Sequence, residues 1–132
     1  MRNIIVEEMD GIPAIKHEVE LVERKGLGHP DSMADGIAEA VSRALCRYYL
    51  DKFGVILHHN TDKGEVCGGA TKPVFGGGEI IRPIFVLLSG QATDKTENET
   101  IPVSKIAIKA AQDYIKSTLP LLNVDDGVLF DS

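Results

Sequence analysis

The sequence predicts an α+β fold, a two-layer unit whose elements follow the order strand, helix, strand, strand, helix, strand. Two observations lead to this class: residues 30–54 and 103–115 have helical spacing of apolar side chains, and short β-type segments lie before, between and after them. The 132 residues are 43% hydrophobic and 26% charged, which fits one folded domain. We therefore expect two helices on one face of a small mixed sheet.

Residues 15–22 alternate between apolar and charged side chains, a pattern typical of a half-buried strand. The apolar face carries Ile15, Val19 and Leu21, and the charged face carries Lys16, Glu18 and Glu20. His17 falls in the apolar phase, so we expect it to be buried. Residues 3–7 are a further candidate strand.

The first helix is predicted from Pro30 up to Gly54, since proline favours the first position of a helix and glycine its end. Its apolar positions are Met33, Ile37, Val41, Ala44 and Tyr48, flanked by Ala34, Ala38 and Leu45. This spacing is the strongest secondary-structure signal in the chain.

The middle of the chain is predicted to form short strands joined by turns. Residues 55–58 are a predicted strand, 61–64 a turn, and 65–69 a minor returning strand. Glycines at 68–69 and 76–78 indicate sharp bends or close backbone approaches. Residues 80–88 are apolar and β-branched enough for a central strand, but Pro83 cannot donate to a ladder and so predicts an edge or a bulge there.

The last third begins with a polar loop, residues 90–100, which is long for a connection and is therefore expected to be either mobile or functional, for example as a gate over a site. The second helix follows and ends before Pro120. Residues 126–127 predict a turn, and 128–130 predict the final strand.

Charge and composition exclude several functional classes. The net charge of −6 argues against a nucleic-acid partner, which needs clustered cations. No apolar run is long enough to span a membrane, and the N-terminus lacks a signal-peptide pattern, so a cytoplasmic protein is expected. Cys46 and Cys67 have no metal-ligand spacing and are predicted to be two reduced, buried thiols.

The clearest chemical signal is residues 25–31, KGLGHPD, between a predicted strand and the first helix. A helix N-terminus gathers free N–H groups and partial positive charge, so Gly28 and His29 can hold a phosphate. Asp31 can hold Mg²⁺ against phosphate oxygens. The alternative is purely structural: Gly28 makes the turn, Pro30 occupies the first helical position and Asp31 balances the helix dipole.

A second polar cluster is residues 58–63, HHNTDK. Asp62 can bind a metal or an amine and Lys63 can neutralise a phosphate, although a polar turn would have the same composition. His58 and His59 are adjacent and point to opposite faces of a strand, so they are not expected to share a metal.

These motifs resemble the S-adenosylmethionine synthetase (methionine adenosyltransferase) family in its archaeal form. The resemblance rests on ERKGLGHPD (23–31), ADGIAEAVSRAL (34–45), HHNTDK (58–63) and FGGG (75–78). Ser32 stands where the bacterial and eukaryotic branch usually has lysine. The resemblance implies that residues 1–132 are a single α/β unit corresponding to the N-terminal third of a longer synthetase, in which three similar units are intertwined.

The resemblance also implies chemistry and partners. The family forms S-adenosylmethionine, phosphate and pyrophosphate from ATP, methionine and water, with Mg²⁺ and K⁺ as ions. It implies that His29 is catalytic, that Gly28, His29, Asp62 and Lys63 bind ATP or substrate, and that Asp31 binds the metal. It further implies a homo-oligomer, most simply a dimer, whose sites lie between subunits, so that this segment alone is inactive.

Two other hypotheses come from the residues alone. The chain can be a stand-alone phosphate- or nucleotide-binding module, or an assembly domain without catalysis. The apolar run in residues 80–88 is too continuous for a strand with one face in water, which predicts a twofold dimer joined through the sheet.

Overall fold

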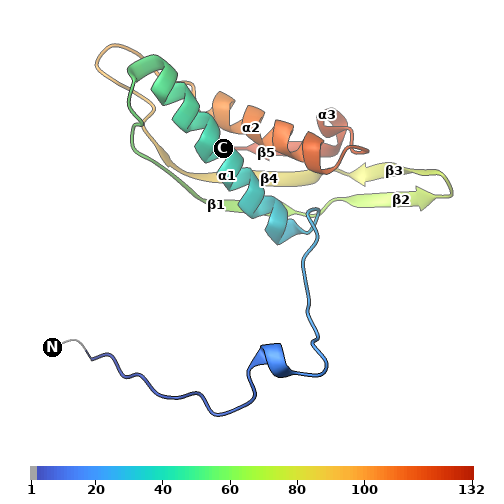
Figure 1. Ribbon diagram of the computed structural model, residues 1–132. Helices are drawn as coiled ribbons and strands as arrows, with labels where there is room; N and C mark the ends of the chain where they lie inside the picture. The colour runs from blue at the N-terminus through green and yellow to red at the C-terminus, as the bar shows by residue number, and fades with distance from the viewer. Residues whose placement is uncertain (1–2) are drawn as a thin grey trace.

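The computed structural model describes residues 3–132 as helices packed on one face of a three-stranded sheet (Figure 1). The sheet has the order β1-β4-β5, from β1 (His59–Cys67), β4 (Ile84–Ala92) and β5 (Val128–Asp131). β1 pairs with β4 antiparallel, and β4 pairs with β5 parallel. The helix layer is α1 (Pro30–Phe53) and α2 (Val103–Thr118). This mixed α/β architecture is compatible with the predicted α+β class.

Helix α1 begins and ends where the sequence predicts. The Nδ1 atom of His29 accepts the N–H of Asp31 at 3.2 Å, and Gly54 adopts a left-handed φ of 70°. In the second half of α1 the buried residues differ from the predicted ones. Leu45 and Tyr49 are fully buried rather than Ala44 and Tyr48, because they continue the i, i+4 row that faces α2 and β1.

The core lies between the two layers. Its fully buried side chains are Met33, Ile37, Val41, Leu45, Tyr49, Val86, Ile101, Ala107, Ala111, Ile115, Val124 and Val128. Close contact between the helices requires glycine at position 36, because a Cβ there would lie 2.0 Å from the Tyr114 hydroxyl. The second predicted helix is confirmed as α2. The close packing at Gly36 was not predicted from the sequence.

Strand β1 occupies the predicted turn at residues 61–64 and includes part of the minor strand predicted at residues 65–69. Residues 55–58 are not a strand, and residues 61–64 are not a turn, because β1 runs from His59 to Cys67 with a register shift between Asn60 and Lys63. The hydroxyl of Thr61 donates to the carbonyl of Ala38 at 3.1 Å, which ties the irregular part of the strand to α1. A bulge thus accommodates the polar residues that the sequence suggested were a turn.

The glycine-rich stretch forms a hairpin that extends the β1–β4 ribbon. β2 (Ala70–Val74) pairs antiparallel with β3 (Gly77–Arg82), and Gly76 in the connecting turn has a φ of 82°. At Gly69 a Cβ would lie 2.4 Å from the Arg82 carbonyl oxygen, so the predicted close approach is confirmed. Pro83 separates β3 from β4, so residues 80–88 belong to two strands rather than one.

The predicted N-terminal strands are wrong. Residues 3–29 contain one short 3₁₀ helix, η1 (Ala14–Lys16), and are otherwise irregular and exposed. His17 is exposed rather than buried, and its Nε2 atom lies 2.9 Å from the Ile12 carbonyl oxygen. A strand needs a partner for its backbone groups, and no described strand pairs with this segment. The predicted six-element order is therefore not observed.

The remaining elements largely follow the prediction. β4 runs to Ala92, and the loop after it is closed at its base by the Ile101 N–H, which donates to the Asp94 carbonyl at 2.7 Å. The mobility of residues 90–100 remains a prediction. Residues 126–127 lie in a one-turn helix, α3 (Val124–Gly127), rather than in a separate turn, and the final strand is confirmed as β5.

Two of the composition-based expectations can also be compared with the structure. Both cysteines are free thiols, but neither is fully buried. Cys67 is exposed at the end of β1, and Cys46 is half-buried on α1 beside the row of fully buried residues. Within residues 3–132, no helix combines the length and apolarity needed to cross a membrane.

Candidate functional site

The helix start, residues 26–31, has a defined geometry. The His29 N–H donates to the Gly26 carbonyl at 3.0 Å, which forms a tight turn directly before α1. Because Nδ1 of the His29 ring accepts the Asp31 N–H, the neutral ring carries its proton on Nε2. No residue in the described range 3–132 hydrogen-bonds to that Nε2 atom, so it is free to donate to a bound anion.

Asp31 is an exposed carboxylate in the first turn of α1, and Lys25 Nζ donates to its Oδ2 atom. This hydrogen bond, together with the charge of Lys25, lowers the pKa of Asp31 below its usual value of 3.8. The carboxylate is therefore ionised at neutral pH. An exposed ion pair of this kind is weak, so Lys25 does not prevent Asp31 from binding a cation.

The helix start fits part of a magnesium site. Among residues 3–132, no group of three or more His, Cys, Asp or Glu side chains is placed to hold a metal ion. Mg²⁺ commonly takes one or two carboxylates and completes its shell with water and phosphate oxygens. Asp31 alone can supply one such ligand, in a site that a phosphate chain would complete.

The structure separates the two residues of the second cluster. Asp62 lies beside Asp35 and Glu39 in an open hollow of about 610 Å³, whereas Lys63 lines a different cavity. The Asp62 N–H donates to the Asn60 side-chain carbonyl at 3.0 Å, within the irregular part of β1. In residues 3–132, no hydrogen bond or ion pair joins Asp62 or Lys63 to the helix start.

The two histidines of this cluster differ in their environments, as the sequence predicts. His58 is exposed, while His59 turns against α1, with its Nε2 atom 3.1 Å from Ser42 Oγ and 3.6 Å from Cys46 Sγ. The Nδ1 atom of His59 lies 3.0 Å from the Leu57 carbonyl oxygen. His59 therefore connects α1 to the start of β1.

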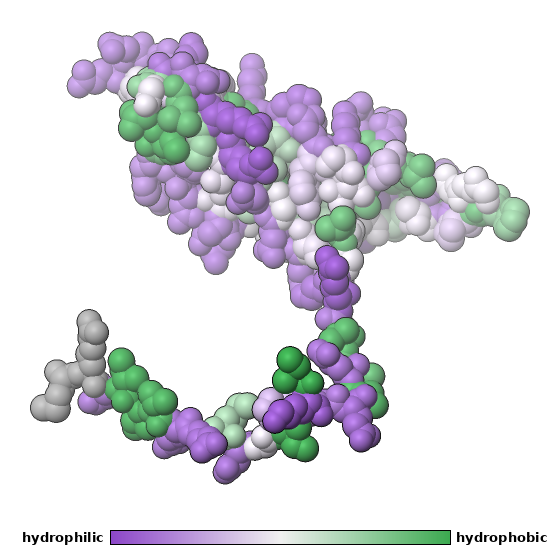
Figure 2. Space-filling model, in the orientation of Figure 1, coloured by the Kyte–Doolittle hydropathy of each residue, from purple (hydrophilic) through white to green (hydrophobic). Residues whose placement is uncertain are grey.

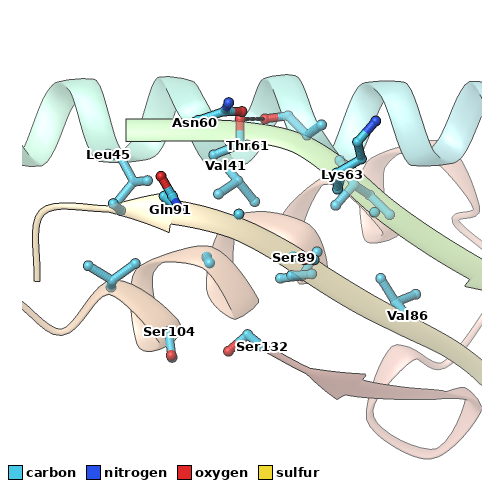
Figure 3. A pocket seen from close by; sticks show the side chains of 18 of the residues that line it. Val41, Leu45, Asn60, Thr61, Lys63, Val86, Ser89, Gln91, Ser104 and Ser132 are labelled. Carbon is cyan, nitrogen blue, oxygen red and sulfur yellow. Dashed lines mark hydrogen bonds between the residues drawn. The ribbon is translucent and has the colours of Figure 1, made fainter. Parts of the chain in front are cut away.

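The cavity lined by Lys63 was not predicted from the sequence. It measures about 600 Å³ and lies between α1, α2, β1 and β4 (Figure 3). Its apolar wall includes Ile37, Val41, Val86 and Leu88, and its polar groups include Asn60, Thr61, Lys63, Ser89, Gln91 and Ser104. The only sequence signal is the presence of small residues such as Ala34, Ala38 and Ala107 on the cavity side of the helices.

Taken together, these sites can bind an anion and one cation, but they offer no complete catalytic centre. The helix start presents a ring N–H donor from His29 and one carboxylate from Asp31, two residues apart. Lys63 supplies a separate positive charge on β1. This arrangement suits a phosphate chain with a divalent ion.

Comparison with known proteins gives one consistent result. The family model described as "S-adenosylmethionine synthetase (AdoMet synthetase)" matches residues 2–132. The chain is 58% identical to an S-adenosylmethionine synthase of Pyrococcus furiosus, over 99% of this chain and 33% of that protein. It is 57% identical to that of Thermoplasma volcanium, over 99% of this chain and 33% of the relative. The chain thus spans about a third of the length of these relatives.

Proposed function

Because this chain belongs to the S-adenosylmethionine synthetase family, we propose that it is the N-terminal unit of an enzyme that forms S-adenosylmethionine, phosphate and pyrophosphate from ATP, methionine and water. The observation that carries the proposal is the helix start, where a ring N–H donor and an ionised carboxylate flank the first turn of α1. A triphosphate with a bound divalent ion needs this pair of groups.

The chemistry of the reaction decides what the residues must do. The methionine sulfur attacks the ribose C5′ carbon, the sulfur–carbon bond forms, and the triphosphate leaves with the electron pair of the broken carbon–oxygen bond. A thioether sulfur has no proton to lose, so no general base is needed. The protein must instead align the reacting atoms and stabilise the charge that develops on the triphosphate.

Each residue of the helix start has a role in that stabilisation. His29 donates from Nε2 to a phosphate oxygen near the breaking bond. A side chain at position 28 would lie 3.2 Å from Leu119 Cδ2, so Gly28 keeps the turn compact and its backbone available to phosphate. Asp31 holds Mg²⁺, which neutralises phosphate charge when bound. Lys63 and Asp62 bind substrate from β1.

Family membership also suggests K⁺ as a second ion and a cytoplasmic location, where ATP and methionine are available. Neither ion has a complete ligand set within residues 3–132. The remaining ligands and cations would come from other parts of a full-length synthetase or from a second subunit. We therefore propose that the catalytic site is shared and that this chain contributes one wall of it.

We expect the isolated 132-residue chain to form no S-adenosylmethionine above background. Alignment and charge stabilisation both require groups beyond the helix start and β1. The measurement is product formation from ATP and labelled methionine, with a full-length synthetase as the positive control. Turnover that copurifies with the chain through a second column would contradict this expectation.

Titration calorimetry with ATP and Mg²⁺ separates the catalytic proposal from a stand-alone binding module. A stand-alone binding module contains a complete site and should bind ATP tightly. A chain that contributes only some residues to a site shared between subunits should bind ATP weakly. His29→Ala should remove whatever binding is seen, and Ser104→Ala, in the cavity between the layers, serves as the control.

The outer face of the sheet supports the proposed dimer. Phe85 and Leu129 are register partners on β4 and β5, and 37% and 57% of their surfaces are exposed. We expect light scattering to show a dimer that Leu129→Lys weakens by about tenfold or more, since it places a charge in an apolar contact. Leu121→Lys is the matched control, because Leu121 is fully exposed and lies outside the sheet. Equal dimerisation of both variants would exclude this face.

A further inference from the structure

A thiol, a hydroxyl and an imidazole meet where α1 packs on the start of β1. Ser42 and Cys46 lie four residues apart on one face of α1, and both are in hydrogen-bond contact with the ring of His59. All three side chains are half-buried. The function proposed above uses none of them. We call these three residues the thiol cluster and ask what chemistry it supports.

The backbone decides which ring nitrogen of His59 carries the proton. Nδ1 lies 3.0 Å from the Leu57 carbonyl oxygen, which can only accept, so Nδ1 is the donor. In the neutral ring Nε2 is therefore an unprotonated acceptor, and it faces Ser42 and Cys46. A base that is oriented by a third group and lies within hydrogen-bond reach of a nucleophile is the arrangement that activates the nucleophile.

Cys46 is the nucleophile that this base can activate. A few per cent of a free thiol is already ionised at neutral pH, whereas a hydroxyl is not. The Cys46 sulfur lies 3.6 Å from Nε2, a hydrogen-bond distance for the large sulfur atom. Nε2 has one lone pair, so Ser42, at 3.1 Å, competes with the thiol for it. Ser42 therefore restrains the reaction of Cys46 rather than assisting it.

The approach to the thiol cluster selects the reagent. Ser42 and His59 lie on the wall of the open hollow of about 610 Å³. The same hollow carries three carboxylates, those of Asp35, Glu39 and Asp62. Negative charge there repels an anionic reagent, and the half-burial of Cys46 disfavours a large one. A small, neutral electrophile meets neither obstacle.

We propose that Cys46 is an oxidant-sensitive thiol, activated by His59, whose substrate class is a small neutral peroxide. The thiol proton moves to Nε2, and the sulfur attacks one peroxide oxygen. The sulfur–oxygen bond forms as the oxygen–oxygen bond breaks, and the leaving hydroxide takes the proton from Nε2 and departs as water. Sulfur is oxidised to a sulfenic acid, and hydrogen peroxide is reduced to water. This reaction does not depend on the chemistry proposed for the helix start.

The second thiol of the chain is too far away to react with the product. His59 and Cys67 are the first and last residues of β1, which spans about 26 Å at about 3.3 Å per residue. A disulfide requires Cα atoms within about 7 Å of each other. The sulfenic acid at Cys46 should therefore persist until an external thiol caps or reduces it.

The two cysteines allow a comparison within one chain. The chain is treated with hydrogen peroxide at pH 7 together with dimedone, which traps sulfenic acids, and peptide mass spectrometry follows each site. We expect Cys46 to be labelled at least about tenfold faster than Cys67, although Cys67 is the more exposed. The hydrogen bond to Glu65 raises the pKa of the Cys67 thiol and keeps it protonated. Labelling of Cys67 as fast as that of Cys46 would overturn the proposal.

Two substitutions separate proton transfer from proximity. Gln at position 59 can still form hydrogen bonds but cannot take a proton, so His59→Gln should slow labelling of Cys46 by about tenfold or more. Ser42→Ala removes the competing donor, so labelling should stay the same or rise. Cys67 is the internal control in both variants, and thermal unfolding checks that they fold. Undiminished labelling in His59→Gln, or an equal loss in Ser42→Ala, would contradict activation by the ring.

A comparison of two alkylating reagents tests the substrate class in the unsubstituted chain. Iodoacetamide is neutral and iodoacetate is an anion of similar size. We expect the ratio of their rates at Cys46 to be at least about threefold higher in the folded chain than in urea, where the carboxylates of the hollow are dispersed. An equal ratio in the two states would show that the hollow does not select neutral reagents.

Discussion

Replacing Asp31 by Asn in a full-length synthetase that carries this segment is expected to lower kcat by about 10²- to 10³-fold, a loss typical for removal of one strong electrostatic contact to a transition state. Asn keeps the size of the side chain and removes its charge, so the metal-bound triphosphate loses one anionic ligand. The side chain is exposed, and its effect on stability should stay within about 0.5 kcal/mol. Steady-state kinetics over a range of Mg²⁺ concentrations, with thermal unfolding alongside, is the measurement.

Lys25→Gln is the matched control for Asp31→Asn. It breaks the same ion pair but leaves the carboxylate, so turnover should fall far less. Because Lys25 lowers the pKa of Asp31, the carboxylate stays ionised below its usual 3.8 and loses its charge only as pH falls through the lowered pKa. Lys25→Gln should therefore shift the acid limit of Mg²⁺ binding upward. Near-normal turnover of Asp31→Asn at limiting Mg²⁺ would disprove the metal role.

The largest effect on stability is expected for Tyr49→Ala, which should lower the free energy of unfolding by about 3–5 kcal/mol. Tyr49 is fully buried, and its ring lies against Tyr48, Phe53 and His59. Truncation removes the centre of this cluster and leaves a cavity between α1 and the start of β1. Since small domains are stable by only about 5–15 kcal/mol, the variant should unfold at much lower urea concentration.

Tyr49→Phe separates packing from hydrogen bonding at the same position. The Tyr49 hydroxyl donates to the Thr93 carbonyl at 3.0 Å, so removal of the oxygen alone should cost about 1 kcal/mol. It should also speed amide exchange in the loop after Thr93, which we already expect to exchange faster than other interior segments. If Tyr49→Ala and Tyr49→Phe lowered the free energy of unfolding equally, the packing of the ring would not be the source of its effect on stability.

The helices were predictable because each carries its own signals. Pro30, Gly54 and the apolar spacing between them are local features, and they mark the ends and the general face of α1 without knowledge of the rest of the fold. The shift from Tyr48 to Tyr49 in the buried row was not predictable, since it depends on where α2 and His59 lie. Local signals therefore define the helix but not its contacts.

The strands were harder to predict because pairing decides them. Residues 15–22 have better alternation than residues 59–67, yet only the latter form a strand within the described chain, because β4 pairs with them. The same limit applies to the candidate site. The place of His29 as a cap follows from its position before Pro30. The separation of Asp62 from Lys63 follows from β1 being a strand at this point rather than the predicted turn, because adjacent strand residues point to opposite faces.

The hairpin of β2 and β3 stands outside the core, and this has a consequence for how the sequence can evolve. None of the hydrophobic side chains that form the core or pack against it lies in residues 68–82. At the tip, Val74 and Phe75 are exposed, and Figure 2 shows apolar surface there. Substitutions at this tip are therefore little constrained by selection for folding, provided that Gly76 persists in the turn. Any apolar residue retained at its tip across lineages would record selection for binding alone.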